Sequence, residues 1–321
     1  MVRAAVNLIP EEPIARMVEL ARHAEALGYE RVWIYDEGLA TRDVYVTMAA
    51  VVAATERLTV GPGITNPYTR HPAATAAAVA SVDELSGGRA FLGIGAGGSL
   101  TLDPIGLERS RPLASVREAI TAARALFRGD AVDIEGETLR LRGARLAYAR
   151  PSTEIWLAGR GPRMLALGGE LCDGVMLDFI HKPSLGATIE RIRAGGRGRA
   201  APARVSYSTM VITDDAAMEA TRPHLTYRLV DSPPAIREAI GLGDDDTERI
   251  RSALADGLAA AAEHVRDEWV LPFVIAGRVD ECATELGDIV ERHGIDEFLL
   301  PVLDDAGAPG LMATVARVLS L

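Results

Sequence analysis

Short apolar runs alternate with amphipathic segments along most of the chain. Apolar runs of about four to eight residues between turn residues predict strands, and apolar positions three or four apart predict helices. Helical spacing begins after Pro13, where proline suits a first helical turn, and ends at Gly28. The runs that predict strands are residues 4–9, 31–36, 57–62, 89–95, 154–159, 173–179, 204–212 and 297–302.

Helices are expected in most of the gaps between these strands, and this order predicts the fold class. Repeated strand–helix units are typical of a parallel sheet. Eight such runs, without a Rossmann-type first turn, favour a closed (β/α)8 TIM barrel over an open sheet. Residues 131–141 resemble a small β-hairpin. The other expected helices span residues 43–55, 72–85, 112–127, 162–171, 184–194 and a last segment from about 310.

Residues 222–270 form a longer connection than a barrel normally needs between a strand and the next helix. The segment is rich in Pro, Asp and Ala, with helical runs at 233–240 and 247–266. We interpret it as a helical insertion after the seventh strand that builds the rim or lid of an active site. The chain has no internal repeat and no low-complexity linker, so residues 1–321 are expected to form a single domain.

The composition narrows the function classes. The chain has 321 residues and a net charge of -11, so it has no general attraction for nucleic acid or an anionic membrane surface. No apolar run reaches the roughly 18 residues that span a bilayer, and the N-terminal apolar run is too short for a signal peptide, so we expect a cytoplasmic protein. Cys172 and Cys282 belong to no CxxC motif or Cys/His cluster, so we expect no metal site.

In a barrel of this kind the active site lies at the carboxyl ends of the strands. Two glycine-rich turns occur there, GAGG at 95–98 and GRGP at 159–162. Glycine allows close approach of the backbone, and free N–H groups at a helix start bind phosphate. Arg160 and Arg163 would add positive charge to the second turn. Tight strand–helix turns without a ligand have the same composition, so this pattern alone leaves both interpretations open.

Three ordered strings carry a resemblance to the bacterial-luciferase-like superfamily. They are VWIYDEGLATRDVYVT, VGPGITNPYTRHPAATAAAVASVDELSGGRAFLGIGAGG and LAGRGPRMLALGGELCDGVM. Within the superfamily they are most similar to the F420-dependent methylenetetrahydromethanopterin reductases. The resemblance implies a TIM-type barrel with an insertion after strand seven, a homodimer, and coenzyme F420 as cofactor, with FMN as the alternative. It also implies a cis peptide bond at Gly63–Ile64 behind the cofactor ring.

The resemblance further implies which residues contact the cofactor. Asp36 would lie near the ring at the end of the second strand. The other residues that match by position would line the ring (Gly63, Ile64, Thr65 and Asn66), border the cofactor (Gly95, Ala96 and Gly97), hold its phosphate (Ala158, Gly159, Arg160 and Gly161) or pack nearby (Val175).

The sequence departs from the family pattern at three positions. Asn7 and Gly98 stand where the reductases carry acidic residues, and Glu37 stands where many F420-dependent relatives have a histidine. We therefore expect the same cofactor pocket with a different substrate.

Hydride transfer often needs a nearby acid or base, and Glu37 and Asp36 are the catalytic candidates because adjacent carboxylates can raise one another's pKa. Glu37 could instead be a solvated loop residue, and Asp36 could cap a helix or pair with Arg42.

Asn7, Arg70 and His181 are the candidates for contact with the substrate. Arg70 could bind a carboxylate or phosphate, or be one of the arginines that commonly lie on a barrel rim. His71 is a further candidate on the pocket side, but it precedes Pro72 and could instead help to begin the third helix. Trp33 and Trp156 lie in strands and are expected in the core.

Three functions remain open at this stage. The first is an F420-dependent oxidoreductase that transfers a hydride between the deazaflavin and a small or medium organic substrate, at a C=C, C=N or alcohol/carbonyl group. The second is an FMN-dependent monooxygenase that uses dioxygen and reduced flavin from a partner reductase. The third is a non-catalytic flavin-binding protein. The TNPY and DELSGGRA strings favour the first function.

Overall fold

Eight parallel strands form one sheet in the computed structural model, which describes residues 2–304 and 306–321. Their order is β3-β2-β1-β12-β9-β8-β7-β4, and bridges from Val60 to Ala90 and from Thr65 to Ile94 join the two end strands. The sheet therefore closes on itself, which confirms the predicted (β/α)8 TIM barrel. The barrel strands are β1 (Arg3–Leu8), β2 (Arg31–Ile34), β3 (Thr59–Pro62), β4 (Phe91–Ile94), β7 (Glu154–Ala158), β8 (Gly174–Asp178), β9 (Arg204–Ser208) and β12 (Glu297–Val302).

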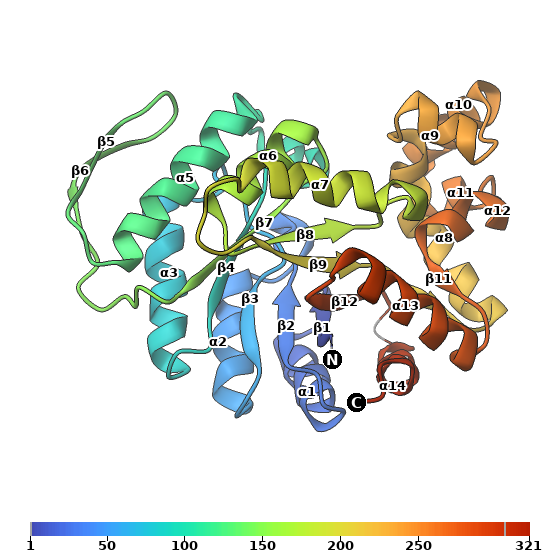
Figure 1. Ribbon diagram of the computed structural model, residues 1–321, viewed down its shortest axis with the longest axis horizontal. Helices are drawn as coiled ribbons and strands as arrows, with labels where there is room; N and C mark the ends of the chain where they lie inside the picture. Colours follow the sequence, from blue (N-terminus) through green and yellow to red (C-terminus); the bar gives the residue numbers. More distant parts are fainter. Residues whose placement is uncertain (1, 305) are drawn as a thin grey trace.

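Helices surround the barrel and cover the outer face of its strands (Figure 1). Most begin and end within two residues of the predicted bounds. None of the helices among the described residues is both long and apolar enough to cross a membrane. The helices of this layer are α1 (Ile14–Ala26), α2 (Val44–Ala54), α3 (Pro72–Leu85), α5 (Pro112–Phe127), α6 (Pro162–Leu171), α7 (Leu185–Gly195), α13 (Val279–His293) and α14 (Ala308–Leu319).

The predicted strand over residues 204–212 is wrong as a single element. β9 ends at Ser208, and the chain then leaves the barrel to form β10 (Val211–Ile212), which pairs with β11 (Ile275–Ala276). The Thr209 hydroxyl donates to the carbonyl oxygen of Phe273 at 2.6 Å at this point of departure. The two halves of this apolar run therefore belong to different sheets. Both halves are buried, which is why the sequence predicts a single strand.

The insertion after the seventh barrel strand is confirmed, but it begins earlier than predicted. Its first helix starts at Asp215, and the segment 247–266 is two helices because Gly257 has a φ of 107°, which glycine adopts readily. The insertion lies at one side of the barrel, away from the β5–β6 hairpin (Figure 1). These elements are α8 (Asp215–Val230), α9 (Pro234–Ala239), α10 (Asp244–Ala253), α11 (Leu258–Ala262), α12 (Asp267–Val270), β5 (Val132–Glu135) and β6 (Arg140–Ala144).

The middle of the barrel is filled by large aromatic side chains. Trp33 lies edge-on to Phe91, with ring centroids 4.5 Å apart, and to Trp156, 5.7 Å apart. These rings fit because a Cβ atom on Gly61 would lie 2.5 Å from the Phe91 ring, and one on Gly174 would lie 2.2 Å from the Trp156 ring. The core positions expected for the two tryptophans are confirmed.

A buried arginine lies below this aromatic layer, at the amino-terminal ends of the strands. The Arg31 side chain is 2% exposed, and its guanidinium carbon lies 4.5 Å from the centre of the Phe91 ring and 4.7 Å from that of Trp156. Its nitrogens pair with Glu154 at 2.8 Å and with Glu297 at 3.3 Å. The cation is therefore enclosed by aromatic faces and two carboxylates.

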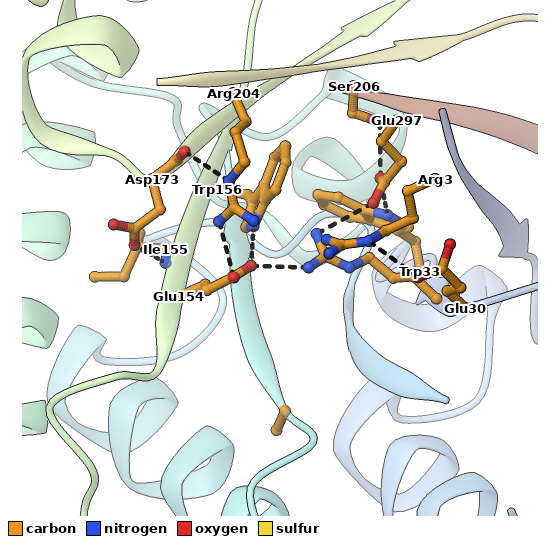
Figure 2. Close-up of polar contacts among 12 residues, drawn as sticks. Arg3, Glu30, Trp33, Glu154, Ile155, Trp156, Asp173, Arg204, Ser206 and Glu297 are labelled. Carbon is orange, nitrogen blue, oxygen red and sulfur yellow. Dashed lines mark hydrogen bonds and ion pairs between the residues drawn. The ribbon is translucent and has the colours of Figure 1, made fainter. Parts of the chain in front are cut away.

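The two glutamates are held in turn by neighbouring strands (Figure 2). Glu297 accepts from the indole of Trp33 at 3.0 Å and from the hydroxyl of Ser206 at 2.9 Å. Glu154 accepts from the indole of Trp156 and pairs with Arg204, both at 2.8 Å. Burial by itself would raise the pKa of Glu154, but the two arginines and the indole outweigh it and lower this pKa to about 2. The network therefore links five strands at the base of the barrel.

We expect Arg31→Met to lower the free energy of unfolding by about 3–5 kcal/mol, because it leaves Glu297 buried without a counter-charge. Urea titration followed by tryptophan fluorescence measures this loss. The matched control is Arg3→Met, since Arg3 forms an exposed 3.7 Å pair with Glu30, which should contribute about 0–1 kcal/mol. Equal losses in the two variants would contradict the importance of the base network.

Candidate active site

A cavity of about 490 Å³ opens at the carboxyl ends of the barrel strands. Its size falls within the range of about 300–1,000 Å³ that is typical of sites for small ligands. Its walls come from β1, from the segments that follow β2, β3 and β4, from the ends of β7 and β8, and from α8. The predicted site residues that line it are Asn7, Asp36, Glu37, Gly63, Ile64, Asn66, Ala96, Gly97, Ala158, Gly159 and Arg160.

The segment after β3 forms one wall and is fastened on both sides. The Gly63–Ile64 bond is cis, as the resemblance implies. The Gly63 amide donates to Ile34 at 2.6 Å, while Thr65 exchanges backbone hydrogen bonds with Gly93 and Gly95 at 3.0 and 2.9 Å. No side chain fits at Gly63, because a Cβ atom there would lie 2.7 Å from the Asn7 side chain.

Asp36 lies at the end of a short chain of hydroxyl groups. It accepts from Thr65 at 2.7 Å, and the Thr65 oxygen in turn accepts from the Tyr45 hydroxyl at 3.4 Å. Burial raises the pKa of Asp36, and the hydrogen bond from Thr65 opposes that rise. A backbone hydrogen bond from Gly38, which begins a short 3-10 helix (Gly38–Ala40), also lowers the pKa of Asp36. Among the described residues Asp36 forms no ion pair with Arg42. It is a partly buried carboxyl group that faces the cavity.

Glu37 is not a solvated loop residue, because its carboxylate accepts from the Thr101 hydroxyl at 2.6 Å. Thr101 belongs to the short helix α4 (Ser99–Leu102), and only 3% of its surface is exposed. Burial raises the pKa of Glu37, the Thr101 hydrogen bond lowers it, and the charge of Asp36 raises it again. The two adjacent carboxyl groups are therefore both easier to protonate than ordinary surface carboxylates.

The glycine-rich turn after β7 leads directly into α6. Gly161 precedes the helix and supplies no side-chain cap, so the first N–H groups of the helix are open to a ligand. Arg160 lines the cavity. Burial, with the charge of Arg160 as a smaller cause, lowers the pKa of the Arg228 guanidinium to about 9. This end of the cavity is therefore positively charged and suited to an anion.

Asn7 is 1% exposed, and its amide nitrogen donates to the Gly63 carbonyl oxygen at 3.1 Å. Its other atom, Oδ1, has no hydrogen-bond partner among the described residues. A carboxylate could not donate to Gly63, so the asparagine holds the wall in a way that an ionised acid at this position could not.

Sequence reasoning missed the side of the cavity that is formed by β8 and α8. Asp178 and Met176 line it from β8, and Tyr227 and Asp231 line it from the insertion. Alternation of side chains along a strand could have identified the β8 pair, because Met176 points into the barrel. The insertion residues gave no such signal, since the sequence does not show how α8 packs on the barrel.

Sequence reasoning also missed Tyr35. Arg31 and Trp33 point into the barrel, so alternation along the strand predicts that Tyr35 points inward as well. It lines the cavity at the end of β2. Burial raises its pKa well above the ordinary value, and the charges of Asp178 and Glu37 add to this. Tyr35 therefore stays protonated and can act as a hydrogen-bond donor.

Six predicted site residues do not line the cavity. Thr65, Gly95 and Gly161 lie directly beside lining residues in the same segments. Val175 points outward, since a Cβ atom on Gly168 of α6 would lie 2.6 Å from its methyl group. Alternation along β8 explains this, because Met176 takes the inward position.

His181 and Arg70 are engaged elsewhere. The His181 ring lies 3.0 Å from the Ser184 hydroxyl and packs on Phe273. Arg70 pairs with Asp43 at 3.1 Å and lies over the Tyr45 ring, outside the cavity lining. His71 caps α3 by accepting from the Ala73 amide, as one of its two interpretations predicted. The described residues include no cluster of His, Cys, Asp and Glu that could hold a metal ion.

Fold and cavity together define a (β/α)8-barrel protein with a small-molecule site at the carboxyl ends of its strands. The chain belongs to the luciferase-like monooxygenase family, whose sequence model matches residues 2–297. It is thus an oxidoreductase of the luciferase-like type.

Two curated relatives are named 5,10-methylenetetrahydromethanopterin reductase. That of Archaeoglobus fulgidus is 33% identical over 315 residues, which cover 95% of this chain and 92% of the relative. That of Methanolobus tindarius is 31% identical over 294 residues, covering 89% and 90%. Among solved structures, the coenzyme F420-dependent tetrahydromethanopterin reductase of Methanopyrus kandleri superposes with a TM-score of 0.88 at 25% identity, over 97% of each chain. The resemblance inferred from the sequence is confirmed.

We expect Thr101→Val to lower the free energy of unfolding at pH 7 by about 1.5–3 kcal/mol, because Glu37 loses its charge-assisted hydrogen bond while the shape at position 101 is kept. The deficit should shrink below the unfolded glutamate pKa of about 4.3, where the side chain is protonated in both states. Denaturant titrations at pH 7 and at a pH below about 4.3 test this. Thr101→Ser keeps the hydroxyl and should behave like the parent protein; a deficit independent of pH would show that Thr101 acts only through packing.

Proposed function

We propose that the protein is an F420-dependent oxidoreductase that transfers a hydride between the deazaflavin and a small or medium organic substrate, at a C=C, C=N or alcohol/carbonyl group. The observation that carries this proposal is the cavity of about 490 Å³ at the strand ends. Its lining includes residues from all three sequence strings that resemble the F420-dependent reductases. F420-dependent reductases are among the chain's relatives, which supports the choice of cofactor.

The wall after β3 fits the ring of such a cofactor. Gly63, Ile64 and Asn66 line the cavity beside Ala96 and Gly97 of the next turn. These residues present backbone and short side chains, which suits a flat aromatic ring. Thr65 and Gly95 would act from behind, because their backbone hydrogen bond fixes the distance between the two segments.

The turn after β7 fits the cofactor's phosphate. Gly159, Arg160 and Gly161 would hold it, together with the first N–H groups of α6 and the end of β7 at Ala158. A phosphate here would also relieve the repulsion between Arg160 and Arg228. The positive charge of this end explains how a chain of net charge -11 can bind an anionic cofactor.

The bound deazaflavin supplies a carbon that accepts or donates a hydride. The protein's own part is to orient the substrate, exclude water and move the accompanying proton. Glu37 and Asp36 are the groups for that proton, because their pKa values are raised and both line the cavity. Thr101 holds one oxygen of Glu37, which leaves the other oxygen to face a substrate, whereas Asp36 is held by the Thr65 hydroxyl and by the Gly38 backbone.

The alternative within the same pocket is an FMN-dependent monooxygenase supplied with reduced flavin by a partner reductase. The family name supports it, and the ring-binding wall would serve either cofactor. A non-catalytic flavin-binding protein is the third possibility. The two carboxyl groups with raised pKa values favour catalysis over storage, since burying them lowers the stability of the folded chain at neutral pH.

We also propose that the protein is a homodimer. An apolar face of small residues runs along the outer sides of α2 and α3, where Val46 is 56% and Leu85 is 60% exposed. The same face of a second copy would cover it. The other residues of this face are Ala50, Ala53, Ala74 and Ala78.

Titration of the purified protein with oxidised F420 and, separately, with FMN tests the proposed function, with cofactor fluorescence as the readout. We expect F420 to bind with micromolar or tighter affinity and FMN to bind much more weakly. The opposite preference would favour the monooxygenase and direct a search for oxygen uptake. Binding of neither cofactor would contradict all three functions.

Arg160→Ala should weaken F420 binding by about 1–3 kcal/mol, because a charge-assisted contact to phosphate is lost. The same fluorescence titration measures the change. Arg142→Ala is the matched control, since this arginine lies on the β5–β6 hairpin with 84% of its side chain exposed. Unchanged affinity in Arg160→Ala would remove the turn after β7 from the cofactor site.

A further inference from the structure

More carboxylates than guanidinium groups line the cavity. Four carboxylates line it, Asp36, Glu37, Asp178 and Asp231, against the guanidinium groups of Arg109 and Arg160. None of the four carboxylates takes part in an ion pair among the described residues. Carboxylates outside the cavity commonly do, as Asp43 pairs with Arg70 and Glu170 with Arg117.

In the proposed function, each arginine in or beside the cavity has a contact of its own. Arg160 would be neutralised by the cofactor's phosphate, and Arg109 donates to the Gly97 carbonyl at the rim. Buried Arg228 lies near Asp178 and Asp231, but its guanidinium donates to the backbone carbonyls of Asp178 and Phe179 rather than to either carboxylate. Hydrogen bonds to carbonyl groups leave the charges of Arg109 and Arg228 in place. With Arg160 neutralised by the cofactor, the four carboxylates still outnumber these two guanidinium groups, so the remaining space would face a net negative charge.

The carboxylates lie on opposite sides of that space. In the closed order of eight strands, β2 and β8 are four positions apart, so Asp36 and Glu37 lie across the barrel from Asp178. One oxygen of Asp178 accepts a hydrogen bond from the Ser208 hydroxyl at 2.9 Å, and its other oxygen has no partner among the described residues. Asp231 is exposed at the rim beside Tyr227. A small substrate between the two sides would be surrounded by acceptors.

An independent observation also points to a hydrogen-bond donor on the ligand. Asn7 lines the same cavity, is 1% exposed, and leaves its Oδ1 atom without a partner. A buried acceptor without a partner destabilises the folded chain, and a ligand N–H group would remove that cost. The cavity thus offers acceptors both at its wall and at its rim.

We infer that the substrate of the proposed hydride transfer carries a positively charged nitrogen, which the carboxylates of Asp178 and Asp231 receive, while the free oxygen of Asn7 is a further acceptor in the same cavity. An ammonium group suits this lining because it has donors only and no acceptor. The exposed ring of Tyr227 at the rim adds a face on which a cation can rest. A neutral alcohol would satisfy the acceptors without neutralising the charge, and an anion would be repelled. The inference rests on the proposed function, which places the phosphate at Arg160.

The test uses F420-loaded protein and three probes of equal size: benzylamine, which is protonated at pH 7, benzyl alcohol and benzoate. Saturation-transfer NMR titrations give their affinities. We expect benzylamine to bind about tenfold more tightly than benzyl alcohol, and benzoate to bind weakest. The preference for benzylamine should fall in 0.5 M salt, as expected for a partly screened charge.

Asp231→Asn and the double variant Asp178→Asn/Asp231→Asn locate the charge. We expect the double variant to bind benzylamine no better than benzyl alcohol, with unchanged affinity for the alcohol. It should bind F420 at least as tightly as the parent protein, because the loss of two negative charges favours an anionic cofactor. Asp288→Asn is the matched control, because Asp288 is an exposed residue of α13. Since Asp231 is exposed, its variant should fold even if the Asp178 variant does not, and it should lose part of the preference.

Equal affinities for benzylamine and benzyl alcohol, or a preference that survives in the double variant, would overturn the inference. If F420 binds while the probes show no preference for the cation, only the inference fails. If F420 itself does not bind, the proposed function fails and the inference fails with it.

Discussion

The buried guanidinium of Arg31 is the constraint on which the rest of the barrel depends. A closed barrel has an interior that only side chains can fill, and a charge placed there must be paired. Arg31 meets both demands, because Phe91 and Trp156 flank it while Glu154 and Glu297 neutralise it. The strands that carry these residues are far apart in the chain. Their pairing at the base therefore fixes the register in which the whole sheet closes.

The interior above that base follows from the alternation of side chains along each strand. In β2, Arg31 lies at the base, Trp33 fills the middle and Tyr35 reaches the cavity. In β8, Met176 fills the middle and Asp178 reaches the cavity. A charged layer, an aromatic layer and a polar upper layer thus lie in order along the barrel axis. The aromatic middle layer separates the structural charges from those of the site. Burial raises the pKa of Asp36 and Glu37 in the site, whereas the paired arginines outweigh burial at the base and lower the pKa of Glu154.

The sequence was sufficient for the barrel because each strand–helix unit carries its own local signal, and residues of both glycine-rich turns line the cavity, as their place after strands predicts. It was insufficient where a residue's role depends on partners distant in the chain. The hydrogen bond from Thr101 to Glu37 joins residues 64 positions apart, and no periodicity predicts it. Val175 was assigned by resemblance of position, whereas alternation along β8 would have chosen its neighbour. Tyr227 and Asp231 depend on how a variable insertion packs, which has no pattern in the sequence.

The division of charge within the cavity connects the cofactor to the substrate. Its positive end, at Arg160 and the start of α6, and its carboxylate-rich walls share one space of about 490 Å³. Charges this close interact strongly where water is excluded, so each ligand changes the field that the other meets. An anion at Arg160 removes the positive charge that offsets Asp178 and Asp231, and it thereby strengthens the attraction of the remaining space for a cation. Binding of the cofactor would in this way prepare the site for its substrate through electrostatics alone, without any movement of the barrel.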